Sequence, residues 1–235
     1  MDTTLIDIKF DFRTDANGGD PDKTSPTLRR YHQLLWSKRL PNGHVFDLDS
    51  NTRNRYLYHK SDLGEFVLTS DSVIQTFQRW QRLSHIKEQL SKREVENFHY
   101  IGYTIGGMMV FPGNRIDGRM TINGARGCNQ KIGDRFDLTL ECIRLYYDGE
   151  NSPLYRDIAR YDQFFRLFID FKGYVDFFLL QDLTVDDYSA VRFFTPFDNF
   201  DSSPLPESVA GYKLFRERTI AFVESRNNRI ANLHR

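Results

Sequence analysis

The sequence predicts an α+β fold: a helix-rich single domain, residues 1–235, with a small, mostly antiparallel sheet. Three observations lead to this prediction. Stretches with the period of a strand and stretches with the spacing of a helix do not alternate strictly along the chain. The second half of the chain is mostly helical. No internal repeat, low-complexity tract or long linker divides the chain.

Short strands are expected where apolar residues alternate with polar ones or cluster between turn residues. Ile6, Ile8, Phe10 and Phe12 alternate with mostly charged residues, which indicates a strand over residues 5–12 with one face in water. The other expected strands are residues 44–48, 65–68, 108–111, 119–122 and 191–194.

The expected helices begin at side chains that can cap a first turn. These are Ser25 followed by Pro26, Asp71 or Ser72, and Ser91 with Glu94 as a capping box. The helices are expected at residues 26–38, 73–90, 92–101, 134–147, 154–170 with a continuation over 175–180, and 208–229.

Charge and cysteine content argue against several classes of protein. Lys and Arg total 32, as do Asp and Glu, so the chain has no general field for DNA or a membrane. Cys128 and Cys142 are too few for a disulfide framework or a four-cysteine zinc site. No signal peptide and no run of about 20 apolar residues is present, so a soluble, cytoplasmic protein is expected.

The helix expected at residues 134–147 carries a narrow charged stripe on an apolar body. At ~100° per residue, Asp134, Asp137, Glu141, Arg144 and Asp148 fall within about one quarter of the circle. In a dry cleft the paired carboxylates would raise a pKa and supply a general acid or base. The alternative is a structural ion network with Arg135 or another arginine.

A glycine-rich segment, residues 123–127, precedes this helix and is expected to form a loop. Backbone N–H groups there, with Asn123 and Arg126, suit an anion such as phosphate. The segment matches neither GxxxxGK[ST] nor GxGxxG, and Asp134 competes for the same helix end. A plain tight turn is the alternative.

The first helix offers a second candidate surface. Arg29, His32 and Trp36 share the face opposite its apolar side, with Lys38 close by, and suit a nucleotide or an RNA segment. A solvated face is the alternative. No histidine spacing indicates a metal, no GxSxG or Cys–His pair indicates a nucleophile, and no cofactor is identified.

Long motifs resemble a known family. They are YTIGGMMVFP at 103–112, TINGARG at 121–127, DRFDLTLECIR at 134–144, DFKGYVDFF at 170–178, and DFR, SPTLRRYH and LWSK near the N-terminus. They are similar to a family of uncharacterised bacterial and phage-associated cytoplasmic proteins, a domain of unknown function. The resemblance implies that origin and supplies no catalytic residue.

The sequence favours a protein that binds a phosphorylated ligand, a nucleotide or RNA, in a polar cleft, with hydrolase or transferase activity left open. The proposed catalytic residues are Glu141 and Asp137, and the proposed ligand-binding residues are Asn123, Arg126, Arg144, Arg29, His32 and Lys38. The alternative is a non-catalytic interaction partner, for example in a host–phage conflict system. That alternative predicts an exposed apolar patch and no deep polar pocket. The oligomeric state is left open.

Overall fold

The computed structural model describes residues 6–49 and 56–233 of the chain. Helices hold 46% of the residues and strands 13%, and the strand pairs described are all antiparallel. The fold is therefore α+β with small antiparallel sheets, as the sequence predicts.

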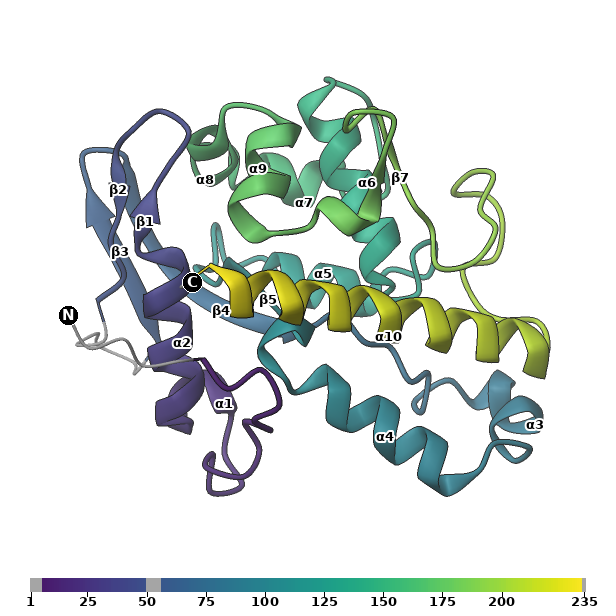
Figure 1. The fold of residues 1–235 in the computed structure, drawn as a ribbon. Coiled ribbons are helices and arrows are strands. Elements are labelled where there is room, and N and C mark those ends of the chain that lie inside the picture. The colour runs from purple at the N-terminus through teal and green to yellow at the C-terminus, as the bar shows by residue number, and fades with distance from the viewer. Residues whose placement is uncertain (1–5, 50–55, 234–235) are drawn as a thin grey trace.

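A three-stranded sheet lies at the centre, in the order β3 (Leu57–Ser61), β4 (Gly64–Ser72) and β5 (Met108–Pro112) (Figure 1). β4 pairs with β3 over its first half and with β5 over its second half. It is therefore longer than the strand expected at 65–68, and its end places Asp71 opposite Met109 of the buried β5.

Two short antiparallel pairs lie outside this sheet. β1 (Lys38–Arg39) pairs with β2 (Val45–Phe46), and β6 (Thr184–Val185) pairs with β7 (Ala190–Val191). The strands expected at 44–48 and 191–194 are thus present but shorter, because each pairs over only two residues.

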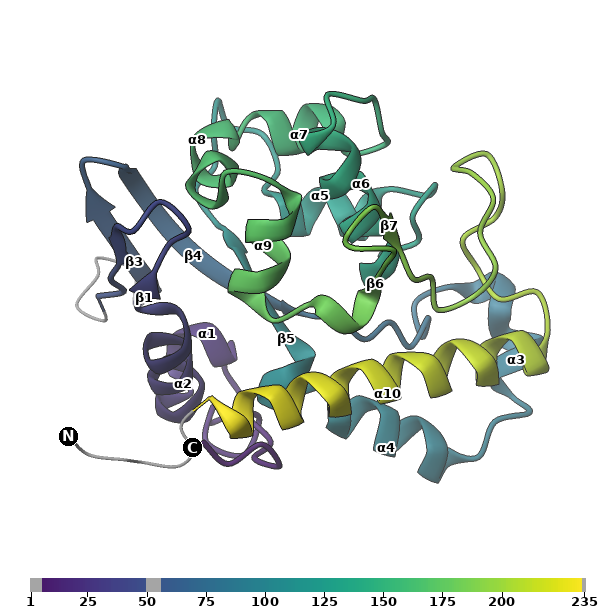
Figure 2. The same cartoon turned by 45° about the horizontal axis from the view of Figure 1, so that its top comes forward.

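Helices lie on both sides of the central sheet. α6, α7, α8 and α9 gather above it in Figure 1, while α4 and α10 pack together below it, as the turned view in Figure 2 also shows. The bounds are α1 Pro21–Thr24, α2 Pro26–Trp36, α3 Ser84–Lys87, α4 Lys92–Gly102, α5 Ile122–Cys128, α6 Phe136–Tyr147, α7 Tyr155–Ala159, α8 Asp162–Phe165, α9 Phe171–Phe178 and α10 Val209–Asn232. Single 3₁₀ turns occupy Gln81–Leu83, Ile105–Gly107, Arg166–Phe168 and Gln181–Leu183.

The core is built largely from aromatic rings. Phe168 lies 5.0–5.3 Å, between ring centroids, from Tyr174, Phe177 and Phe178. All four side chains are buried. Rings of this size supply much apolar area per residue, so short helices such as α7, α8 and α9 still form a continuous core.

Helix starts that depend on local capping lie where the sequence places them. Ser25 Oγ accepts the N–H of Leu28 at the start of α2, and Ser91 with Glu94 forms the expected capping box of α4. A cap needs only residues within one turn of each other, so the sequence alone contains the information.

The strand expected over residues 5–12 is wrong for its described part, residues 6–12, which form turns. The side chain of Asp7 accepts the N–H of Lys9, and that of Asp11 accepts the N–H of Arg13. Aspartate side chains thus take backbone donors that a strand ladder would need.

The helix expected over residues 73–90 is also mostly absent, and only Ser84–Lys87 of this range is α-helical. Ser72 Oγ accepts the N–H of Ile74, and Gln75 Oε1 accepts that of Phe77, which has a φ of +55°. Side-chain acceptors replace the helical bonds there, and a bulky residue at positive φ ends any regular helix.

Three further expectations are corrected. The strand at 119–122 and the glycine-rich loop at 123–127 are replaced by a turn and by α5, whose N-cap Thr121 accepts the N–H of Gly124. The single helix at 154–170 is instead a series of short turns of helix, ending at Ile169 with a φ of +72°. Burial of the aromatic side chains outweighs helix continuity there.

Arg226 of α10 joins both sides of the core. Its fully buried guanidinium donates to the carbonyls of Gly106 and Met108, next to and in β5, and to that of Phe178 at the end of α9. No carboxylate of the described residues forms an ion pair with it. Burial therefore lowers its pKa to about 10.

Asp22 fastens the N-terminal segment to the sheet. Its buried carboxyl accepts the backbone N–H and hydroxyl of Ser70 in β4, and its carbonyl accepts from Arg29. Burial, with the charges of Asp20 and Asp71, raises the pKa of Asp22 to about 7 even though the Ser70 bonds lower it.

We expect the free energy of unfolding to fall as the pH rises from about 4 to 7. Asp22 holds its proton up to a pKa of about 7 in the folded chain, whereas an unfolded aspartate loses it near 3.9. Folding therefore binds a proton in this window, and ionisation costs up to ~4 kcal/mol. Urea unfolding at pH 4.5 and 7.5 measures the slope. The variant Asp22→Asn should lack this pH dependence of the free energy of unfolding. The same pH dependence in that variant would contradict its attribution to Asp22.

Candidate functional site

A polar cleft of about 480 Å³ opens where the end of β4 meets the segment 73–80, α4 and the end of α5. Its polar lining combines carboxylates, amides, a guanidinium and an imidazole: Asp71, Asp134, Gln75, Gln78, Arg79 and His99. Such a mixture of donors and acceptors on several elements is typical of a binding site for a small polar molecule.

Arg126 lies beneath this cleft and joins two of its carboxylates. The guanidinium is fully buried, with Nη1 3.1 Å from Asp71 Oδ2 and Nη2 3.4 Å from Asp134 Oδ1. Its Nε donates to Thr139 Oγ1 on α6. Two carboxylates from separate segments are thereby held on one cation.

The local structure explains how Arg126 reaches Asp71. Asn123 and Arg126 are three residues apart on α5 and share one side of it, while Thr69 and Asp71 alternate onto one face of β4. Asn123 Nδ2 donates to Thr69 Oγ1, and Arg126 Nη1 donates to Asp71 Oδ2. The side chains of the predicted pair Asn123 and Arg126 therefore both bind β4.

Asp134 is held in an unusual backbone conformation, with a φ of +58°. Gln75 Nε2 donates to its Oδ2 at 2.9 Å. Burial raises the pKa of Asp134, Arg126 opposes that effect, and the negative charge of Asp71 adds to it. With Phe77 also at positive φ, two strained positions flank the cleft, a pattern that accumulates at functional sites.

Aromatic rings complete the walls of the cleft. Tyr103, His99 and Trp80 line it, and the ring of Tyr103 is covered on one side by the guanidinium of Arg13 at 4.7 Å. Burial and the charge of Arg13 lower the pKa of His99, which favours the neutral imidazole. The cleft therefore offers flat apolar surfaces beside its hydrogen-bonding groups.

The charged stripe of α6 does not reach this cleft as a unit. Asp137 is fully buried, accepts two bonds from Arg135, and also accepts the N–H of Phe194. Glu141 pairs with Arg144 at 2.7 Å, and Arg144 also binds Asp148. α6 is largely buried, as predicted. Asp137, Glu141, Arg144 and Asp148 form ion pairs within the fold, whereas Asp134, the first residue of the stripe, lines the cleft.

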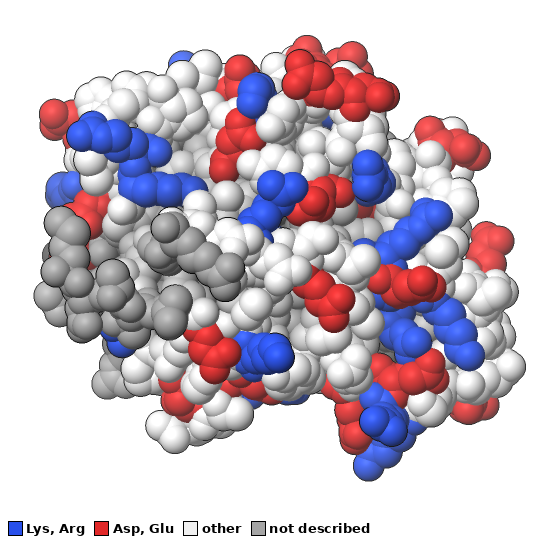
Figure 3. All heavy atoms as spheres, viewed as in Figure 1, with Lys and Arg blue, Asp and Glu red and all other residues white. Residues whose placement is uncertain are grey.

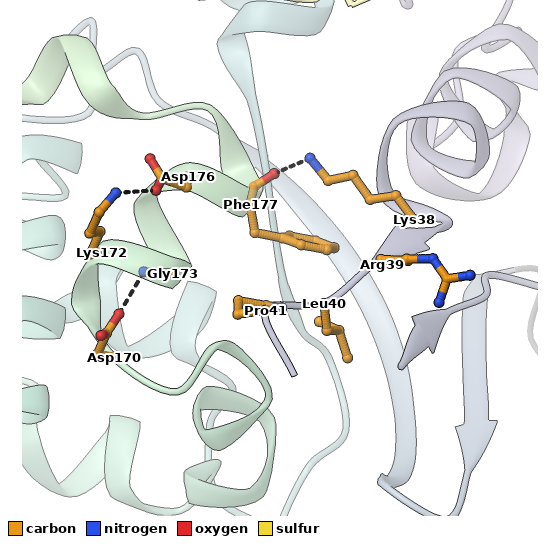
Figure 4. Close-up of a pocket in the computed structure, with 9 residues that line it drawn as sticks. All are labelled: Lys38, Arg39, Leu40, Pro41, Asp170, Lys172, Gly173, Asp176 and Phe177. Carbon is orange, nitrogen blue, oxygen red and sulfur yellow. Dashed lines mark hydrogen bonds and ion pairs between the residues drawn. The ribbon is translucent and has the colours of Figure 1, made fainter. Parts of the chain in front are cut away.

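The other predicted ligand-binding residues lie elsewhere. Arg29 donates to the carbonyl of Asp22, and His32 is buried with Nδ1 accepting from Trp36. Burial lowers the pKa of His32 to about 3. Lys38 lines a different cavity, drawn in Figure 4. Of the predicted set, Arg126 contacts two carboxylates that line the cleft and Asn123 binds Thr69 of β4, but neither side chain lines the cleft itself.

Asp71 and Gln75 were missed because the sequence places them at a helix start. The structure places Asp71 in β4 and Gln75 in a segment without regular secondary structure. The available signal was the alternation of Thr69 with Asp71, which continues the strand past residue 68.

Comparison with protein families matches residues 6–230 to a family of unknown function, DUF6994. The chain belongs to this family. No curated protein and no solved structure matches it. The resemblance seen in the sequence is thereby confirmed at the level of an uncharacterised family, and membership in DUF6994 assigns no activity.

Two features are absent from residues 6–49 and 56–233. No cluster of three or more His, Cys, Asp or Glu side chains arranged to hold a metal ion occurs there. No helix of that part is long and apolar enough to cross a bilayer.

The two predicted catalytic carboxylates should differ sharply in their effect on stability. Asp137→Asn leaves the buried Arg135 without its counter-charge, and we expect a loss of ~3 kcal/mol or more. Glu141→Gln weakens a pair at the edge of the core, with an expected loss of ~1 kcal/mol or less. Urea unfolding at pH 7 measures both, and equal stability of Asp137→Asn and the unaltered chain would refute the structural role.

Proposed function

We propose that this protein binds a hydroxyl-rich small molecule, a sugar or a ribonucleoside, in the cleft beside Asp71 and Asp134. The observation that carries the proposal is the pair of carboxylates held on the buried Arg126. A carboxylate has several acceptor positions, and a fixed pair suits the two donors of a vicinal diol. Ribose hydroxyls are bound by acidic side chains in dinucleotide-binding folds.

The buried guanidinium of Arg126 holds the carboxylates of Asp71 and Asp134 in place before a ligand binds. Two neighbouring carboxylates repel each other, and a mobile counter-ion would not hold them at fixed positions. Arg126 is fully buried, and its Nε donates to Thr139 Oγ1 of α6, so its guanidinium is held by more than the two carboxylates. The ligand therefore does not have to order these groups on binding, which favours affinity.

The rings of Trp80, His99 and Tyr103 support the same class of ligand. Sugars and nucleosides present a flat, less polar face beside their hydroxyl groups, and aromatic side chains pack against such faces. The neutral imidazole of His99 adds one donor and one acceptor.

The charges of the cleft count against a phosphate group bound at Arg126. The N–H groups of that side chain face Asp71, Asp134 and Thr139, so a phosphate there would meet two carboxylates. Arg79 at the exposed rim is the cation left for a phosphate of a nucleotide. On the face drawn in Figure 3, positive and negative side chains are interspersed, without the continuous basic track that suits an RNA backbone.

Acid–base chemistry on a glycosidic bond is the reaction this pair suits best. Burial raises the pKa of Asp134, which is the direction that a general acid requires, while the charge of Arg126 opposes the rise. Asp71 lies on the other arm of the same guanidinium and is more exposed, which suits a group that accepts a proton from water.

No comparable observation favours the interaction-partner reading. The large exposed apolar side chains of the described residues come from separate parts of the fold: Leu34, Val45, Tyr100, Met120, Ile169 and Leu233. Single exposed apolar residues are ordinary on a surface and do not form a docking patch.

A panel of adenosine, 2′-deoxyadenosine, AMP, uridine and glucose, measured by thermal shift and calorimetry, tests the proposal. We expect stabilisation by adenosine, uridine or glucose, and weaker binding of 2′-deoxyadenosine than of adenosine if the ligand is a ribonucleoside. Asp71→Asn and Asp134→Asn should each weaken binding about tenfold or more, because a charged acceptor is lost.

Glu141→Gln is the matched control, since it removes a carboxylate of the same protein outside the cleft. It should bind like the unaltered chain. Absence of binding across the panel, or equal weakening by the control, would reject the proposal.

A further inference from the structure

A second cavity, of about 470 Å³, lies between the β1–β2 hairpin and α9. Two lysines line it from opposite walls, Lys38 of β1 and Lys172 of α9 (Figure 4). Their surroundings differ, and the difference points to chemistry at one of them.

Lys38 has no carboxylate of the described residues within ion-pair distance. Its Nζ donates to the carbonyl of Phe177 at 2.6 Å (Figure 4). The same nitrogen lies 4.6 Å from the ring centre of Phe177 and 5.1 Å from that of Trp36. Burial and the positive charge of Arg226 lower the pKa of Lys38 to about 8, although Asp176 acts in the opposite direction.

Lys172, in the same cavity, differs from Lys38 because it has a carboxylate partner. Its Nζ lies 2.7 Å from Asp176 Oδ2, and its side chain is half exposed. The hydrogen bond to Asp176 raises the pKa of Lys172. The other charged groups of the wall are engaged within the fold, since Asp170 accepts the N–H of Gly173 and Arg39 donates to the carbonyl of Gly43.

We propose that Lys38 is a nucleophilic amine that forms an imine with an aldehyde entering this cavity. In the neutral amine, one N–H donates to the Phe177 carbonyl, and the described residues offer the lone pair no hydrogen-bond donor. The lone pair attacks the carbonyl carbon and the C=O π bond breaks. The oxygen then leaves as water with both amine protons, and a C=N bond to Nζ remains.

Reductive alkylation with propanal and cyanoborohydride tests the proposal on the folded, full-length chain, with modified lysines located by peptide mass spectrometry. At pH 7 about a tenth of an amine with a pKa of about 8 is neutral, against less than ~0.1% for one above 10.5. We expect Lys38 to react at least about tenfold faster than Lys172. Its rate should level off above a pH of about 8.

Three controls accompany this measurement. Lys38→Arg keeps the cation and should abolish the fast-reacting site, whereas Lys172→Arg should leave it unchanged. In urea the two lysines should react equally, because both then have ordinary surroundings. Equal rates in the folded chain, or an unmodified Lys38, would overturn the proposal.

Discussion

A guanidinium group taken out of water needs acceptors for its N–H groups, and the acceptors bound by three buried arginines join distant parts of the molecule. Arg126, Arg135 and Arg226 are all buried, and each binds segments far from it in sequence. Arg126 donates a hydrogen bond to the carboxylate of Asp71 in β4, and Arg135 donates to the carbonyl of Pro204. Arg226 donates to carbonyls on both sides of the core. Their placement decides which segments meet.

The three arginines differ in how their charge is balanced. Arg135 has a full counter-charge in Asp137, and Arg126 shares two carboxylates that are partly open to the cleft. Arg226 is met by carbonyl dipoles and by the ring of Trp36, and no carboxylate of the described residues forms an ion pair with it. Its uncompensated charge, together with burial, lowers the pKa of both His32 and Lys38. The packing of α10 is therefore directly linked to the reactivity proposed for Lys38.

β4 shows how one strand serves two purposes. Ser70 faces the N-terminal segment and binds Asp22, while the next residue, Asp71, faces α5 and binds Arg126. Successive side chains of a strand point to opposite faces. The contact of Ser70 with Asp22 and the contact of Asp71 with Arg126 therefore lie one residue apart on β4. A change in the charge of Asp22 therefore acts close to the acidic pair, which is consistent with the effect of Asp71 on the pKa of Asp22.

The sequence by itself determined what depends on residues close along the chain: the fold class, the caps at Ser25 and Ser91, and the buried character of α6. It also led to Asn123 and Arg126, although as an anion loop rather than as a helix. Only the tertiary structure decided that Arg126 meets Asp71, 55 residues away, and that Asp137 is closed off by Arg135 and Phe194. The sequence does not show which charged side chains pair with each other. The interaction energy of a pair depends on burial and distance, and these are set only when the chain packs.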